Sequence, residues 1–118
     1  MPFPSSILLG MRIDIRSKRP ILRNNVGGMS GPAVFPIAVR MVWQVSNAVS
    51  IPVIGMGGVD SGAAAMEMML AGASAVQVGA AIFTDPYAPV RIVEELQALL
   101  EEQHIADVKE IIGAVKPW

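Results

Sequence analysis

Two short apolar runs, each followed closely by glycine, dominate the hydrophobic pattern of the chain. Residues 52–55 form the first run, and Gly57 and Gly58 come just behind it. Residues 75–78 form the second, which ends at Gly79. Short apolar runs bounded by glycine are typical of buried strands, and the short connections to the helices behind them favour parallel strands. The pattern therefore predicts an α/β fold.

Helical periodicity accounts for most of the remaining chain from residue 32 onward. Apolar residues recur at a spacing of three to four with polar residues opposite, as in helices that cover a core. The predicted helices span residues 32–48, 61–71, 88–104 and 107–114, with a short additional helix over 80–83. We expect Asp60 to cap the second of these helices and Gly72 to end it.

A different pattern, alternating apolar and charged residues, marks the beginning of the chain. Residues 11–16 have the period of a half-exposed strand, residues 17–20 are predicted to turn, and residues 21–22 to return. Six charged residues lie in this hairpin: Arg12, Asp14, Arg16, Lys18, Arg19 and Arg23. Two interpretations stay open, a solvated face and a protruding hairpin that contacts a partner. We accordingly divide the chain into residues 1–26 and 27–118.

Composition limits both the size of the fold and its partners. The 118 residues are too few for a complete (β/α)8 barrel, which takes about 250. Because 53% of them are hydrophobic and only 16% are charged, the chain needs further protein to cover it. A net charge of −1 without a basic patch argues against nucleic acid as a partner. The sequence contains no cysteine, no apolar run long enough to span a membrane and no basic leader, so we expect a cytoplasmic protein without disulfides or a metal site.

The glycines behind the two apolar runs form the candidate binding site. Parallel strands end at the same edge of a sheet, so the amide N–H groups of both loops and the helices behind them point at one place, which suits a phosphate. Glycine loops after the last two strands hold phosphate in many (β/α)8 barrels. The competing interpretation is that these glycines only permit tight turns.

Other polar residues are weaker candidates for chemistry. The glutamates of the helix over 88–104 have helical spacing on one face, which predicts a solvated surface: Glu94, Glu95, Glu101 and Glu102. His104 is expected near the end of that helix without a catalytic role. Trp43 lies off the apolar stripe of its helix, so we expect it to pack on a neighbouring helix or to form an oligomer contact.

Several stretches, in order and spacing, resemble the C-terminal part of class 1B dihydroorotate dehydrogenase catalytic subunits. They are LLGM at 8–11, GGMSGPA at 27–33, IGMGG at 54–58, LAGASAVQVG at 70–79 and DPY at 85–87. The resemblance implies the last βα units of a (β/α)8 barrel that binds FMN and oxidises dihydroorotate to orotate in pyrimidine biosynthesis. It also implies a homo-oligomer and a partner subunit with FAD and an iron–sulfur cluster, which passes electrons to NAD.

The matching motifs carry the family's flavin contacts onto five positions of this chain. The resemblance implies FMN contacts from Gly31, Gly57, Gly58 and Gly79, with Ala80 beside them. The family usually has threonine where Ala80 stands. A hydroxyl near the flavin phosphate is therefore replaced by a methyl group, while the backbone donor remains.

Substrate contacts and the catalytic base are where the chain departs from the family. Ser6 and Ile7 stand where the family has the Asn-Thr pair that contacts substrate, so this contact is altered or lost. The family's cysteine base and its lysine and asparagine flavin ligands precede the motifs found here. We therefore predict no catalytic residue in this chain and no activity from it alone, with the N-terminal part of the barrel as a required partner. Two alternatives stay open. One is another FMN or phosphate barrel, such as a dihydrouridine synthase-like or glutamate synthase-like protein, and the other is a non-catalytic half-barrel subunit.

Overall fold

The computed structural model describes residues 8–118, and it divides the chain between Ser30 and Gly31 into two compact units. The sequence placed this division four residues earlier, after Val26. The difference arises because Gly27 and Gly28, which we expected in a loop, form a strand of the first unit.

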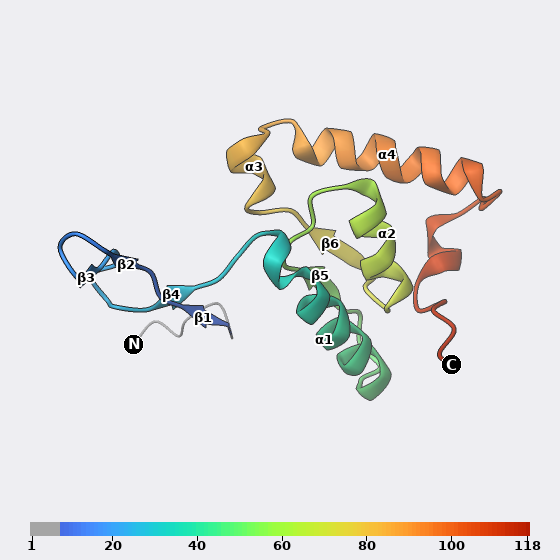
Figure 1. Cartoon of the computed structure of the whole chain (residues 1–118). Helices are drawn as coiled ribbons and strands as arrows, with labels where there is room; N and C mark the ends of the chain where they lie inside the picture. The colour runs from blue at the N-terminus through green and yellow to red at the C-terminus, as the bar shows by residue number, and fades with distance from the viewer. Residues whose placement is uncertain (1–7) are drawn as a thin grey trace. The chain divides into compact units, whose positions relative to one another are not determined.

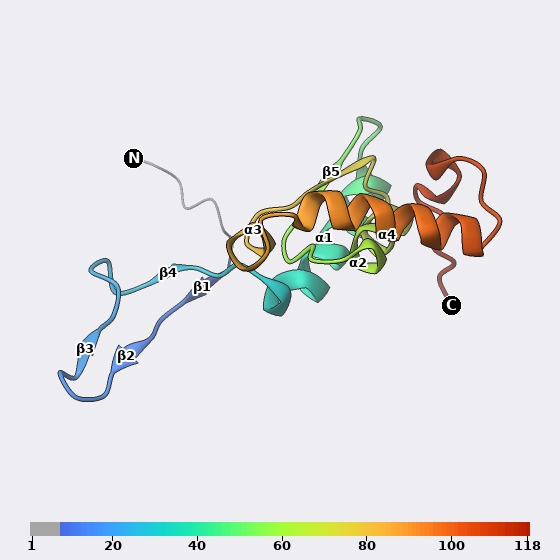
Figure 2. The same ribbon diagram turned by 90° about the horizontal axis from the view of Figure 1, so that it is seen from above.

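The first unit is a narrow antiparallel ribbon with two paired sections. β1 (Leu9–Gly10) pairs with β4 (Gly27–Gly28), and β2 (Ile13–Asp14) pairs with β3 (Arg19–Pro20), as Figure 2 shows. The predicted turn over 17–20 was wrong, because Arg19 already pairs with Asp14. The turn spans residues 15–18 and is closed by the Lys18 amide, which donates to the Asp14 carbonyl at 2.8 Å. Asp14 also accepts from the Arg16 amide and the Ser17 hydroxyl.

Pairing in this ribbon sorts its side chains onto two faces. Ile13 lies opposite Pro20 on one face, and Asp14 lies opposite Arg19 on the other. None of residues 8–30 is buried, and Ile15 at the turn is 87% exposed. A two-stranded ribbon without a covered apolar face has little stability of its own, so this unit depends on protein outside residues 8–30.

The second unit follows the predicted order of helices and strands. The 3-10 turn η1 (Pro32–Val34) leads into α1 (Phe35–Ala48), and α2 (Gly62–Leu70) connects the strands β5 (Ile54–Met56) and β6 (Ala75–Gln77). α3 (Ala81–Thr84), α4 (Ala88–Glu102) and the 3-10 turn η2 (Val108–Ile111) follow. β5 and β6 are parallel, with Gly55 opposite Val76, so the predicted α/β arrangement with parallel strands is confirmed (Figure 1).

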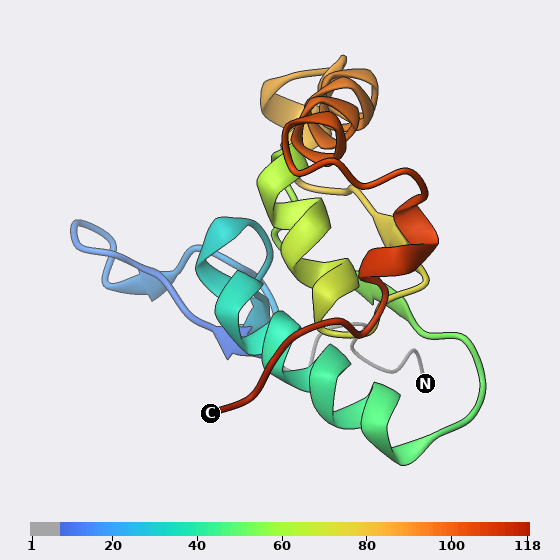
Figure 3. The same ribbon diagram turned by 90° about the vertical axis from the view of Figure 1, so that its right-hand side faces the viewer.

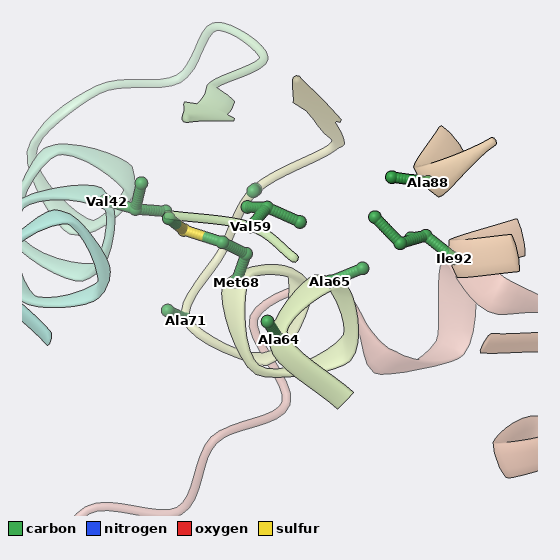
Figure 4. Close-up of a cluster of buried hydrophobic side chains, with 9 residues drawn as sticks. Val42, Val59, Ala64, Ala65, Met68, Ala71, Ala88 and Ile92 are labelled. Atoms are coloured by element: carbon green, nitrogen blue, oxygen red, sulfur yellow. The ribbon is translucent and has the colours of Figure 1, made fainter. Parts of the chain in front are cut away.

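The core of this unit lies where α2 packs against the two strands and against α1 and α4. Met68 of α2 is fully buried and lies among Val42 of α1, Val59 and the strand pair, as Figure 4 shows. Gly55 allows this close packing, since a Cβ on it would lie 3.0 Å from the Met68 sulfur. Ile92 of α4 completes the cluster on its other side. The methionines of α2 are therefore core residues.

The C-terminal segment packs along α2 and differs from the expected helix. Residues 107–114 contain only the 3-10 turn η2, which begins with a capping box between Asp107 and Glu110. Beyond it, the Gly113 amide donates to the Met69 carbonyl at 2.9 Å, and the Val115 amide donates to the Leu70 carbonyl at 3.1 Å. The course of the C-terminal segment can be followed in Figure 3. The Val115 bond satisfies the Leu70 carbonyl, and the Gly113 bond adds a further donor to the Met69 carbonyl, which also accepts from the Gly72 amide at 2.9 Å. These bonds hold the segment in an extended conformation beside the end of α2.

One face of the strand pair is not covered within residues 8–118. Ile54 and Met56 of β5 are 52% and 55% exposed, although we expected a buried strand. The intervening Gly55 is buried against α2. Parallel strands are normally covered on both faces, so the exposure of this apolar face departs from the usual arrangement. Trp43 is likewise 40% exposed on α1, and it borders a shallow groove with Ala71 and the C-terminal segment.

Candidate functional site

The candidate site lies at the edge where β5 and β6 end. Met56 and Gln77, the last residues of the two strands, lie opposite each other in the parallel ladder. The loop containing Gly57 and Gly58 and the loop containing Gly79 therefore leave the sheet side by side. The sequence prediction that both glycine loops share one edge is confirmed by this register.

Gly31, Gly57 and Gly58 are brought together by close packing. Gly58 has a φ of +75°, and a Cβ on it would lie 2.6 Å from the Gly31 carbonyl oxygen and 2.9 Å from the Phe35 Cβ. Gly57 has a φ of +114°, and a Cβ there would lie 3.0 Å from the Ala38 Cβ. Both conformations favour glycine. The need for glycine at 57 and 58 is therefore explained within this chain by the approach of η1 and α1.

Gly79 differs from these glycines because nothing in the described chain requires it. Its φ lies outside the left-handed region, and a Cβ on it would meet no heavy atom within 4 Å. The residue is also exposed. A glycine at a strand end with open space around it is typical of a backbone that another molecule approaches closely. The backbone at Gly79 is thus open to approach within residues 8–118.

The short helix α3 begins directly behind Gly79. Its first hydrogen bonds run from the Ile82 amide to the Gly79 carbonyl at 3.0 Å and from the Phe83 amide to the Ala80 carbonyl at 3.1 Å. The Ala80 and Ala81 amides precede these bonds, so they have no acceptor within the turn. Ala80 occupies the N-cap position and offers no side-chain oxygen to them. The donors that the start of α3 offers at this edge are therefore backbone amides.

The N-terminus of α2, which we expected to face the phosphate, is already occupied by oxygen atoms of the chain. The Gly62 amide donates to Oε2 of Glu95 at 2.6 Å, and the Ala64 amide donates to Oγ of Ser61 at 3.1 Å. Ser61 is therefore the N-cap, and the prediction of Asp60 was wrong. These two amides are therefore satisfied within the chain, unlike those at the start of α3.

Glu95 is the functional residue that the sequence prediction misplaced. We expected it on a solvated face, but it is only partly exposed and holds Gly62 with one oxygen and Arg91 with the other. The hydrogen bond from the Gly62 amide, together with the Arg91 guanidinium, lowers the pKa of Glu95 below its usual value. The available signal was the spacing of four residues between Arg91 and Glu95 on one helix, which predicts an ion pair.

Arg91 links three separate segments around the site. Its Nε lies 3.0 Å from Oδ2 of Asp85, and its Nη1 lies 2.7 Å from Oε1 of Glu95. Its Nη2 donates to the Asp60 carbonyl at 3.1 Å. The hydrogen bonds to Glu95 and then to Asp85 raise the pKa of Arg91 above its usual value. Within residues 8–118 these are the only two ion pairs.

The remaining predicted residues lie away from this edge or outside residues 8–118, which the structure describes. Ser6 and Ile7, the doubtful substrate contacts, lie outside the described residues. His104 is exposed beyond the end of α4, with a φ of +56°. No helix among residues 8–118 is long and apolar enough to cross a bilayer.

Comparison with known proteins gives consistent matches. Residues 3–100 match the family model for dihydroorotate dehydrogenase. The chain is 61% identical over 109 residues to the dihydroorotate dehydrogenase B (NAD(+)) catalytic subunit of Geobacter metallireducens, and this match covers 92% of the chain and 36% of the relative. It is 54% identical over 106 residues to the equivalent subunit of Halalkalibacterium halodurans, with 90% and 35% covered. The chain thus spans about a third of the length of these curated relatives.

A solved structure supports the same relationship. The dihydroorotate dehydrogenase of Eimeria tenella, crystallised with ferulenol, superposes with a TM-score of 0.73 at 27% sequence identity. The superposition covers 89% of this chain and 29% of that one. These matches support the dihydroorotate dehydrogenase interpretation of the sequence, and they do not support the dihydrouridine synthase-like alternative.

Proposed function

Because the chain belongs to the dihydroorotate dehydrogenase family, we propose that its glycine loops hold the phosphate end of FMN in an enzyme that oxidises dihydroorotate to orotate. The observation that carries this proposal is Gly79, a strand-end glycine whose surroundings within residues 8–118 are open. Backbone amides behind it, at Ala80 and Ala81, begin a helical turn without acceptors of their own. A dianionic phosphate is the ligand that such donors favour.

Each part of the site has a distinct role in this proposal. When bound, FMN accepts the electrons that dihydroorotate loses. Gly79, Ala80 and Ala81 donate backbone hydrogen bonds, each contributing about 1.5–3 kcal/mol when the acceptor is charged. Gly57 and Gly58 let their loop pass close to η1, so that Gly31 lies against the same edge. The chain supplies binding and orientation, and the proton-abstracting base comes from outside it.

We further propose that β5 and β6 are the last strands of a (β/α)8 barrel whose other strands lie in a preceding part of the polypeptide. Support comes from the exposed apolar face of Ile54 and Met56, which needs cover. Support also comes from the share of its relatives that the chain spans, about a third. The 118-residue chain alone should therefore be inactive, and a cytoplasmic location stays part of this proposal.

A partner with an acidic surface is also part of the proposal. The relatives named above are catalytic subunits, which favours an electron-transfer subunit with FAD and an iron–sulfur cluster as the partner. Self-association into a homo-oligomer belongs to the same proposal. The hairpin of the first unit supports a charged contact, because its five basic residues are exposed and form no ion pair within residues 8–118: Arg12, Arg16, Lys18, Arg19 and Arg23. Reversing Arg16 and Lys18 to glutamate should weaken subunit co-purification without changing flavin content.

The enzyme function is tested in the intact polypeptide that carries this segment. We expect the purified protein to contain FMN, and we expect dihydroorotate to bleach the oxidised flavin spectrum under anaerobic conditions. Dihydrouridine serves as the control substrate, and it should leave the spectrum unchanged. Bleaching by neither compound, or by dihydrouridine alone, would refute the assignment even if FMN is present.

A further inference from the structure

We infer that Arg91 is a positioning residue that holds the two glycine loops in register for the phosphate. This inference rests on the proposed FMN site. All three nitrogen positions of its guanidinium group are used, and each reaches a different segment. Nη2 holds the Asp60 carbonyl at the end of the first loop, Nε holds Asp85 at the end of α3, and Nη1 holds Glu95.

The Asp85 contact fixes the direction of α3. Oδ2 of Asp85 accepts from Arg91, while Oδ1 accepts from the Tyr87 amide at 3.0 Å, so both oxygens are engaged. The Asp85 amide in turn donates to the Ala81 carbonyl at 2.9 Å, which ties it to the first residue of α3. α3 has four residues and is therefore about 6 Å long. Restraining Asp85 consequently restrains the Ala80 and Ala81 amides at its other end.

The Asp60 and Glu95 contacts restrain the other loop. Asp60 lies two residues after Gly58, and Glu95 accepts from the amide of Gly62, two residues further along. Arg91 thus connects the loop that contains Gly57 and Gly58 with α3, the helix that follows Gly79. A planar group with donors in three directions is needed for this contact, and lysine offers only a point charge on a flexible stem. The side chain itself is partly exposed and lies on α4, outside the loops that it connects.

The matched control is Arg40, an exposed residue of α1. Its side chain makes a single hydrogen bond, to Gln44 at 2.6 Å on the same helix. The variants Arg91→Met, Arg91→Lys and Arg40→Met are made in the intact polypeptide. Dissociation constants are measured for FMN and for riboflavin, which lacks the phosphate, and apo-protein melting is recorded in parallel. The ratio of the two constants reports the phosphate contacts and is insensitive to a general loss of stability.

We expect wild type and Arg40→Met to prefer FMN over riboflavin by the same factor. Arg91→Met should reduce that preference about tenfold, the effect of one charge-assisted hydrogen bond, and Arg91→Lys should give an intermediate value. If Arg91→Met does not fold, Arg91→Lys decides. An unchanged ratio in the folded variant, whatever its melting temperature, would overturn the inference. A wild-type protein without preference for FMN would instead overturn the phosphate site itself, and with it the role of Arg91.

Discussion

Replacing Gly79 by alanine should separate ligand binding from folding. The added Cβ meets no protein atom within 4 Å, and φ lies outside the left-handed region. The free energy of unfolding of the apo-protein should therefore stay equal or rise by up to about 1 kcal/mol, because alanine restricts the unfolded chain. In the proposed site, the same methyl group lies where the phosphate is expected to approach. Losing one charge-assisted hydrogen bond of about 1.5–3 kcal/mol should raise the FMN dissociation constant about 10- to 150-fold.

Gly58→Ala is the comparison variant, in which we expect the added methyl group to destabilise the apo-protein itself. With a φ of +75° and the Gly31 carbonyl oxygen 2.6 Å from the new Cβ, the variant should lose stability even without flavin. The left-handed conformation alone costs about 1–2 kcal/mol. Both variants are assayed in the intact polypeptide by denaturant unfolding of the apo-protein and by flavin fluorescence titration. If Gly79→Ala binds FMN as wild type does, the phosphate does not lie at this loop and the reasoning is refuted.

Three further predictions concern acid stability, the core and the uncovered face. Folding lowers the pKa of Glu95, so its contribution to stability is present above its unfolded pKa, near 4.5, and is lost as the pH falls through the lower folded pKa. Glu95→Gln should therefore flatten the loss of stability between about pH 5 and pH 3, and an unchanged acid profile would contradict this. Met68→Ala removes a fully buried side chain and should lower the free energy of unfolding by about 2–5 kcal/mol, measured by urea unfolding, with exposed Met11→Ala as the control. The isolated 118-residue chain exposes Ile54 and Met56 on β5 and should self-associate in sedimentation experiments, so a monomer that melts cooperatively would count against the exposed-face argument.

Local signals in the sequence predicted most of the second unit. The strand, glycine loop and helix recur in the expected order, and α4 begins at the predicted residue, Ala88. Gly72 ends α2 with a φ of +124°, as its position predicted. These features succeed because hydrophobic period, glycine and proline act over a few residues. Element ends were less predictable: Ser61 and not Asp60 caps α2, since both are good capping residues in adjacent positions.

The contacts that organise the site were not predictable in this way. The spacing of four residues predicts the pair of Glu95 with Arg91, but no local pattern predicts that Glu95 also accepts from the Gly62 amide across 33 residues. The ribbon was misjudged for a related reason. Gly27 and Gly28 have no strand propensity, and they form a strand because Leu9 and Gly10 lie opposite them. In both cases the structure of a residue is determined by a tertiary contact that the local sequence pattern does not reveal.

The hydrogen bonds and ion pairs around Arg91 have a consequence for the order of folding during synthesis. The contacts that join the two glycine loops, from Gly31 against Gly58 to Gly62 with Glu95, all close between residues 31 and 95. The hydrogen bonds among these contacts join residues 31 and 33 positions apart, and chains emerge from the ribosome N-terminus first. The residues of the loop edge therefore leave the ribosome before η2 does, so their contacts can form before those of η2. Those late residues then close the opposite end of α2, where the Gly113 amide meets the Met69 carbonyl.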